Sequence, residues 1–194
     1  MTDRKAQLAA NLAQVEERIT SACAAAGRER EEVTLIVVTK TYPASDVRML
    51  HELGVRHVAE NRDQDAAPKA TACADLSLTW HFVGQLQTNK VRSVMSYADV
   101  VQSVDRIKLV TALSGAAVRA ERELGCLIQV ALDAESGERG ERGGVAPDGI
   151  EELAAAGGAG GGGGGGGRFY RGAVGGAVLG RERGAVERGL VITT

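Results

Sequence analysis

The fold of this chain is decided by the stretch VTLIVVTK at residues 33–40. Its first seven residues are mostly apolar and β-branched, without strict alternation, which is typical of a strand covered on both faces. Before this strand, apolar residues at spacings of three and four predict a helix that ends at Gly27. After it, Ser45 and Asp46 can cap a second helix that stops at Gly54.

The same alternation of strand and helix recurs along the chain. We expect strands at residues 55–59, 78–83, 99–103 and 126–132, and helices at residues 64–72, 88–95, 107–124 and 150–156. Strands that alternate with helices in this way indicate a parallel sheet of the α/β class. No Gly-x-Gly-x-x-Gly follows the first strand, which disfavours an open dinucleotide-binding sheet. We therefore predict a (β/α)8 barrel.

The composition changes after Ala156. The chain has 26 glycines among 194 residues, and residues 157–167 are glycine with a single alanine. Such a run buries no side chains, so we interpret it as a flexible linker or an artefact of the sequence. The remaining residues are too few for three more βα units of about 30 residues each. We predict a barrel portion at residues 1–156 that is incomplete beyond that point, a linker at 157–167 and a degenerate remnant at 168–194.

Charge and composition disfavour several classes of function. The formal net charge is −2, and Lys and Arg are not clustered, so neither nucleic acid nor a membrane is an expected partner. No apolar run approaches the roughly 20 residues that span a bilayer, and no signal-peptide pattern is present. The spacings of the three cysteines and three histidines indicate neither a metal site nor a disulfide framework. We expect a cytoplasmic protein.

Lys40 is the strongest candidate for chemistry. Active sites of βα barrels lie at the C-terminal ends of the strands, and Lys40 follows directly after the first strand. An amine in this partly desolvated position suits Schiff-base formation. Asn61 follows the second strand and could orient a ligand or the lysine. The alternatives are a surface lysine and an ordinary turn asparagine, and His81 inside the third strand is more typical of a hydrogen-bonded barrel residue than of a base.

Five segments, in order, resemble motifs of the pyridoxal phosphate homeostasis protein family. They are VVTKTYP at 37–43, VAENRDQ at 58–64, WHFVGQLQTNK at 80–90, QSVD at 102–105 and LIQV at 127–130. That family is a barrel of the alanine racemase N-terminal-domain kind that holds pyridoxal 5'-phosphate (PLP) as a Schiff base. The resemblance implies that Lys40 carries PLP and that Asn61, His81 and Ser103 surround it.

The resemblance is incomplete where the family binds the PLP phosphate. Its Ser-Met-Gly-Met-Ser segment is absent here, and its Arg-x-Gly-Thr segment corresponds at best to residues 173–180. Gly175 and Gly176 are the cofactor-binding candidates there. The family's asparagine in the fifth strand is Ala131 in this chain. Because backbone N–H groups normally hold such a phosphate, we expect weaker PLP binding than in the family.

The resemblance implies a monomeric PLP carrier that buffers the cofactor or delivers it to PLP-dependent apoenzymes, without established turnover. One alternative is a PLP enzyme such as an amino-acid racemase, but a second base would need a further domain. Another is an inactive fragment of the family. A third is a different Schiff-base barrel enzyme such as an aldolase, which the ordered motifs disfavour.

Overall fold

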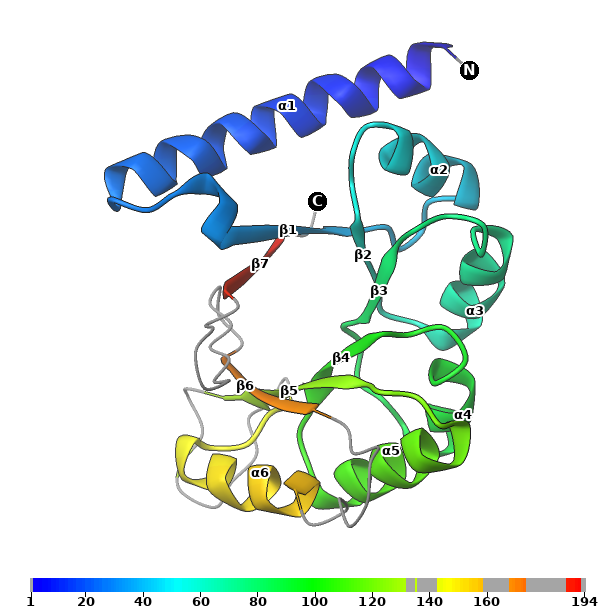
Figure 1. Cartoon of the computed structure of the whole chain (residues 1–194), viewed down its shortest axis with the longest axis vertical. Helices are drawn as coiled ribbons and strands as arrows, with labels where there is room; N and C mark the ends of the chain where they lie inside the picture. The colour runs from blue at the N-terminus through cyan, green and yellow to red at the C-terminus, as the bar shows by residue number, and fades with distance from the viewer. Residues whose placement is uncertain (1, 132–134, 136–142, 159–167, 174–187, 193–194) are drawn as a thin grey trace.

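A curved parallel sheet organises the chain (Figure 1). The computed structural model describes residues 2–131, 135, 143–158, 168–173 and 188–192. Within them the sheet has seven strands in the order β6-β5-β4-β3-β2-β1-β7, and all the pairings are parallel. The strands are β1 (Val33–Val38), β2 (His57–Glu60), β3 (Thr79–Phe82), β4 (Val100–Val104), β5 (Gly125–Val130), β6 (Arg168–Ala173) and β7 (Arg188–Ile192).

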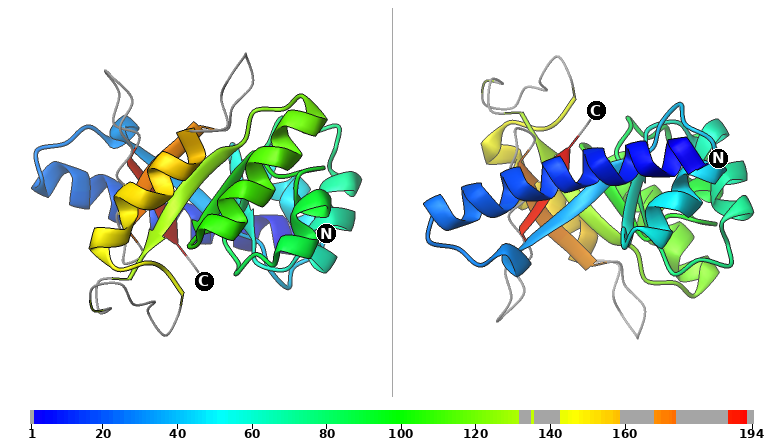
Figure 2. Two further views of the ribbon diagram at one scale, coloured as in Figure 1. Left: turned by 90° about the horizontal axis from the view of Figure 1, so that it is seen from below. Right: turned by 90° about the horizontal axis from the view of Figure 1, so that it is seen from above.

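Helices cover the outer side of the curve. They are α1 (Thr2–Ala25), α2 (Ala44–Glu52), α3 (Asp63–Ala72), α4 (Val91–Val94), α5 (Ile107–Ala120) and α6 (Ile150–Gly158), with short 3-10 helices η1 (Arg30–Glu32), η2 (Thr88–Lys90) and η3 (Pro147–Gly149). Helices α2 to α6 follow one another around the strands, and α1 crosses the molecule beside α2 (Figures 1 and 2). The five predicted βα units are therefore confirmed, as is the α/β class.

The prediction of an incomplete barrel is also confirmed. Strands β6 and β7 are the two edges of the sheet, and no pairing joins them among the residues that the structure describes. Both come after residue 156, in a segment whose weak periodicity predicted no strand. They pair with β5 and β1, whose backbone edges each form hydrogen bonds with a parallel neighbour. The boundaries at residues 156 and 167 stay predictions, and residues 159–167 lie outside the described ranges.

The two faces of the sheet bury different residues. On the outer face, Val37 and Val58 pack against residues of α2 and α3. On the inner face, Ile36, Val38 and Ala59 form a small cluster of their own. This is the period of two that a strand imposes on its side chains. Residues in phase with Val38 and Ala59 therefore face the inside of the curve.

The predicted cap of α2 is wrong. The helix begins at Ala44, Pro43 occupies the N-cap position, and no side chain caps it. The carboxylate of Asp46 instead accepts hydrogen bonds from Arg4, with its Oδ2 2.6 Å from Nη2, and so ties α2 to α1. The predicted helix ends are confirmed, because Gly27 and Gly54 adopt φ values of +63° and +97° just beyond α1 and α2.

Two further observations concern the cysteines and the helices. All three cysteines are buried and carry free thiols. Within the described ranges, no helix is both long enough and apolar enough to cross a membrane.

Candidate functional site

The candidate site lies at the C-terminal ends of β1, β2 and β3. Val38 is paired with Ala59, and Ala59 with His81. Continuing this register by two residues places Lys40 beside Asn61 at one level of the sheet. His81 lies two residues before that level, which is about 7 Å deeper along the strand. The register of the strands thus predicts Lys40 and Asn61 at one level, with His81 one layer below them.

A tight turn presents Lys40 after β1. The Tyr42 amide donates to the Thr39 carbonyl oxygen over 3.2 Å, which closes a turn with Lys40 at its second position. Thr41, at the third position, has a φ of +69°, as a type II turn requires. A β-branched residue in this region is an outlier, and such strain, of order 1–3 kcal/mol, gathers at functional sites. Lys40 is partly exposed and its amine has no polar partner among the described residues.

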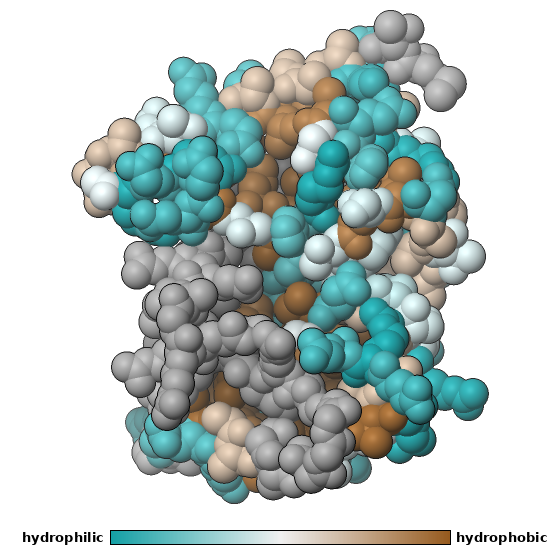
Figure 3. Space-filling view, in the orientation of Figure 1, coloured by the Kyte–Doolittle hydropathy of each residue, from teal (hydrophilic) through white to brown (hydrophobic). Residues whose placement is uncertain are grey.

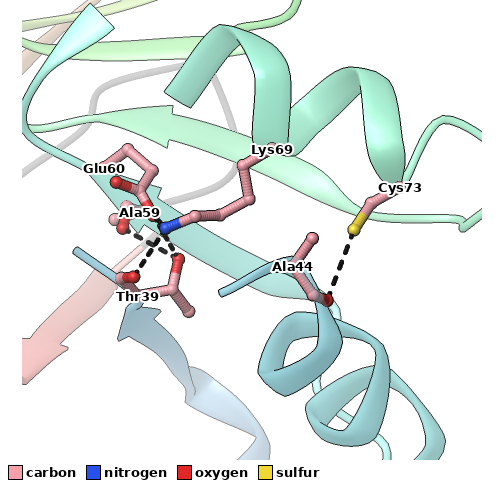
Figure 4. A network of polar contacts seen from close by, with 6 residues as sticks. All are labelled: Thr39, Ala44, Ala59, Glu60, Lys69 and Cys73. Carbon is pink, nitrogen blue, oxygen red and sulfur yellow. Dashed lines mark hydrogen bonds and ion pairs between the residues drawn. The ribbon is translucent and has the colours of Figure 1, made fainter. Parts of the chain in front are cut away.

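A buried polar network supports this turn from the helix side (Figure 4). The Lys69 amine of α3 donates to the Thr39 carbonyl oxygen over 2.8 Å and to Glu60 Oε1 over 2.5 Å. The Thr39 hydroxyl donates to the same Glu60 oxygen over 2.7 Å. The side chains of Lys69 and Glu60 are 8% and 0% exposed. The network therefore joins the ends of β1 and β2 to α3 at an almost fully buried site.

The sequence reasoning missed Lys69, although a signal was present. Ala66, Ala70 and Cys73 are fully or almost fully buried, and they lie at spacings of four and three along α3 and its C-terminal end. Lys69 falls on this same helical face, directly before Ala70. A lysine on an otherwise apolar face needs a buried partner, because an isolated buried charge is unfavourable.

His81 belongs to a chain of side chains inside the curve of the sheet. Its Nε2 lies 3.1 Å from His57 Nδ1, and its Nδ1 lies 3.0 Å from Gln102 Nε2. Burial, and secondarily the charge of His57, lowers the pKa of His81 to about 3, so the ring is neutral at pH 7. Which group donates in each of these two contacts depends on which ring nitrogens carry protons. Both nitrogens of His81 are thus used by the protein, and its role toward a cofactor stays a prediction.

Ser103 carries a buried hydroxyl without a hydrogen-bond partner among the described residues. The residue is 1% exposed, and its Oγ has no hydrogen-bond partner within the described part of the chain. It lies in a register irregularity of β4 between Val101 and Val104. Irregularities of this kind are common beside active sites, and buried polar groups without a partner are rare. The hydroxyl is therefore a candidate hydrogen-bond donor, and its role toward a cofactor stays a prediction.

Asn61 is held in place by the loop that follows β3. A Cβ atom added to Gly84 would lie 1.9 Å from the Asn61 carbonyl oxygen. The Val83 amide donates to the Glu60 carbonyl oxygen over 2.9 Å. This backbone contact explains the glycine in the WHFVGQLQTNK segment. The two other candidates, Gly175 and Gly176, lie outside the residues that the structure describes.

An apolar cavity lies on the other side of β1. Its volume is about 150 Å³, and residues of α1, β1 and α2 line it, among them Leu8, Leu12, Val37 and Leu50. Figure 3 shows apolar side chains gathered beneath α1 on this face. The cavity is on the helix side of β1, whereas the alternation of β1 places Lys40 on the inner side. Thr39 and Tyr42 also line it, so the cavity adjoins the turn that bears Lys40 from the helix side.

Comparisons with known sequences identify the relatives of this chain. Residues 6–162 match the family described as alanine racemase, N-terminal domain. The chain is 38% identical over 171 residues to the pyridoxal phosphate homeostasis protein of Mycobacterium leprae, covering 79% of this chain and 65% of that protein. It is 39% identical to the protein of that name from Pseudomonas aeruginosa, covering 76% and 62%. The chain thus spans slightly less than two thirds of these relatives.

Solved structures show the same fold. A protein from Bifidobacterium adolescentis, described only as an unknown protein, aligns with a TM-score of 0.70 at 30% identity, covering 80% of this chain and 66% of that one. PipY of Synechococcus elongatus, with PLP bound, aligns with a TM-score of 0.58 at 32% identity, covering 72% and 64%. A D-threonine aldolase from Filomicrobium marinum has a TM-score of 0.55 at 21% identity, covering 80% and 40%, which is a likeness of fold alone.

Proposed function

Because the chain belongs to the alanine racemase N-terminal domain family, we propose that it binds PLP covalently through Lys40 and serves in PLP homeostasis. The family match and the relatives' names confirm the resemblance on which this proposal is built. PipY, which is 32% identical, has been solved with PLP bound.

The proposal rests on the environment of the Lys40 amine. Its amine is partly exposed, lies at the strand ends and has no polar partner among the described residues. PLP supplies an aldehyde, which condenses with a primary amine and releases water. A lysine committed to an ion pair would have to break that pair first, as Lys69 would. Lys40 is free to react.

Other described residues fit a cofactor at this place. Asn61 lies at the level of Lys40, and its carboxamide can donate to a ring oxygen. The buried Ser103 hydroxyl has no partner within the described ranges, so it too can donate. Gly175 and Gly176 remain predictions for the phosphate. The chain therefore offers a covalent anchor and two hydrogen-bonding groups along neighbouring strands.

We propose a carrier rather than an enzyme, one that passes PLP to apoenzymes and acts as a cytoplasmic monomer. The relatives are named for PLP homeostasis. His81, the nearest histidine to the lysine's level, is neutral and has both ring nitrogens occupied. It is poorly suited to exchange protons as the second base of a racemase, which supports the carrier.

Borohydride trapping tests the attachment. The purified chain is incubated with PLP, its absorbance spectrum is recorded, and the reduced protein is mapped by peptide mass spectrometry. We expect the adduct on Lys40, its loss in Lys40→Ala, and its retention in Lys108→Ala, which changes an exposed lysine of α5. A folded wild-type chain with no adduct, or with its adduct on another lysine, would contradict the proposal.

Transfer is tested separately. The loaded protein is mixed with a PLP-dependent apoenzyme in the presence of a phosphatase that destroys free PLP. We expect the apoenzyme to be reactivated by the loaded chain but not by the same amount of free PLP. Equal reactivation from both sources, or none from the loaded chain, would rule out direct delivery.

A further inference from the structure

The carbonyl oxygen of Thr39 accepts two hydrogen bonds, and only one of them is local. The Tyr42 amide, three residues on, closes the turn over 3.2 Å. The second donor is the Lys69 amine, 30 residues away in α3, at 2.8 Å. A hydrogen bond from a charged donor is roughly twice as strong as one between neutral groups. The residue immediately before Lys40 is thus anchored to a distant helix.

Glu60 completes this anchor. One of its oxygens accepts from both Lys69 and the Thr39 hydroxyl. A buried ion pair is weak evidence for stability, because desolvation offsets the attraction between its charges. Its directional contacts nevertheless join three elements. Helix α3 is itself held, since Ser93 of α4 donates to Asp63 at its first residue over 2.8 Å.

The anchor stands next to a strained backbone. Thr41 has a φ of +69°, a conformation that persists only where surrounding contacts hold it. The network residues Thr39 and Glu60 immediately precede Lys40 and Asn61 in the sequence. Alternation along the strands directs the network toward α3 and the two candidate residues toward the inner side. Lys69 can therefore act on the site through the backbone without touching a ligand.

We propose that Lys69, neutralised by Glu60, is a positioning residue that holds the turn bearing Lys40 in the geometry that covalent PLP attachment requires. This inference rests on the proposed PLP binding and adds to it the device that orients the lysine. Without the ammonium, the Thr39 carbonyl oxygen loses its long-range donor, and the strained turn can relax and move the Lys40 amine.

The decisive variant is the double substitution Glu60→Gln/Lys69→Met. It removes both charges together, so no unpaired charge is left buried, and the introduced carboxamide can still accept from the Thr39 hydroxyl. We expect its PLP affinity to fall by at least about tenfold, roughly the worth of one charge-assisted hydrogen bond. We also expect a shifted pH midpoint for the absorbance band of attached PLP and faster hydrogen exchange of the Tyr42 amide without PLP. Lys69→Arg, which keeps the charge, should restore part of the affinity.

Arg122→Met is the matched control. Arg122 donates to the carbonyl oxygens of Met95 and Ala98 and pairs with Asp99, at the opposite end of the strands. This variant should lose stability but keep the affinity, the pH midpoint and the Tyr42 exchange rate of the wild type. A folded double variant that matches the wild type in all three measurements would overturn the positioning role alone. Absence of any Lys40 adduct in the wild type would overturn this inference together with the proposed function.

Discussion

Gly84 packs directly on Asn61, because a Cβ atom at residue 84 would lie 1.9 Å from the Asn61 carbonyl oxygen. The obstacle is backbone, which cannot rotate away as a side chain can. The loop after β3 and the end of β2 therefore have one relative position. That position places Gly84, from the segment WHFVGQLQTNK, against Asn61, a candidate PLP-binding residue.

Gly84→Ala should accordingly lower the free energy of unfolding by about 3 kcal/mol, since overpacking against backbone forces it to shift. Urea denaturation measures this change. Gly115→Ala in α5 is the control, because its Cβ would meet only the flexible Arg119 side chain, at 3.3 Å. That variant should be neutral or stabilised by about 0.5–1 kcal/mol, as alanine favours the helix. Equal stability of the two variants would refute the close contact.

Thr41→Gly should be more stable than Thr41→Ala by about 1 kcal/mol. Alanine keeps the steric cost of a left-handed conformation, which glycine does not have. The φ of +69° at this position is the reason for the difference. Thermal denaturation of both variants checks the ranking, and a less stable glycine variant would show that the turn has another geometry in solution.

His81 should make the protein less stable in acid. Burial, with the charge of His57, lowers the pKa of His81 from 6.5 to about 3 in the folded chain. Between these values the unfolded chain binds a proton that the folded chain excludes. The free energy of unfolding therefore falls as the pH drops below about 6.5, by up to about 1.4 kcal/mol per pH unit, and this loss ends near pH 3.

His81→Gln tests this pH dependence. The variant loses a buried ring, so its stability at pH 7 should be lower than that of the wild type. Between pH 7 and pH 5, its unfolding free energy should nevertheless depend less steeply on pH. The difference in slope should correspond to the uptake of up to one proton on unfolding. An unchanged slope would mean that the ring takes up a proton in the folded state.

Ser103→Ala and Thr39→Val should separate two kinds of buried hydroxyl. The Ser103 hydroxyl has no partner in the described part of the chain, so its removal should change stability by less than about 1 kcal/mol. The Thr39 hydroxyl donates to Glu60, so its removal should cost about 1.5–3 kcal/mol. Chemical denaturation compares them, and a strongly destabilised Ser103→Ala would reveal a structural partner. We also expect Ser103→Ala to bind PLP more weakly.

Lys69→Met should lower the free energy of unfolding by about 3–5 kcal/mol, because it leaves the Glu60 carboxylate buried and uncompensated. The double variant Glu60→Gln/Lys69→Met should regain most of this loss. A double-mutant cycle by urea denaturation measures the coupling between the two residues. Additive effects would show that the pair does not interact in solution.

Much of the fold was predictable from local pattern. Five strands and the helices between them follow from apolar spacing, and the two helix ends at Gly27 and Gly54 follow from their need for positive φ. Strands β6 and β7 escaped prediction, although β7 carries the apolar run Leu190-Val191-Ile192, because the segment around them is rich in Gly and Arg and shows no strand–helix alternation.

The candidate site was predictable only in part. Lys40 and Asn61 could be placed together, because each follows a strand and neighbouring parallel strands end at the same edge of the sheet. The partners of His81 could not be placed, because the contact with His57 depends on the register between β2 and β3.

The sequence by itself determined the order of the first five strands and their helices, the family resemblance and the position of the candidate lysine. These depend on residue types and spacings within short segments. Only the tertiary structure decided that Lys69 anchors the turn at Thr39, that His81 is neutral and occupied on both sides, and that the Ser103 hydroxyl has no partner among the described residues. Such properties arise when the chain brings groups 20 or more residues apart into a site without water, where the available partners decide the behaviour of each polar group.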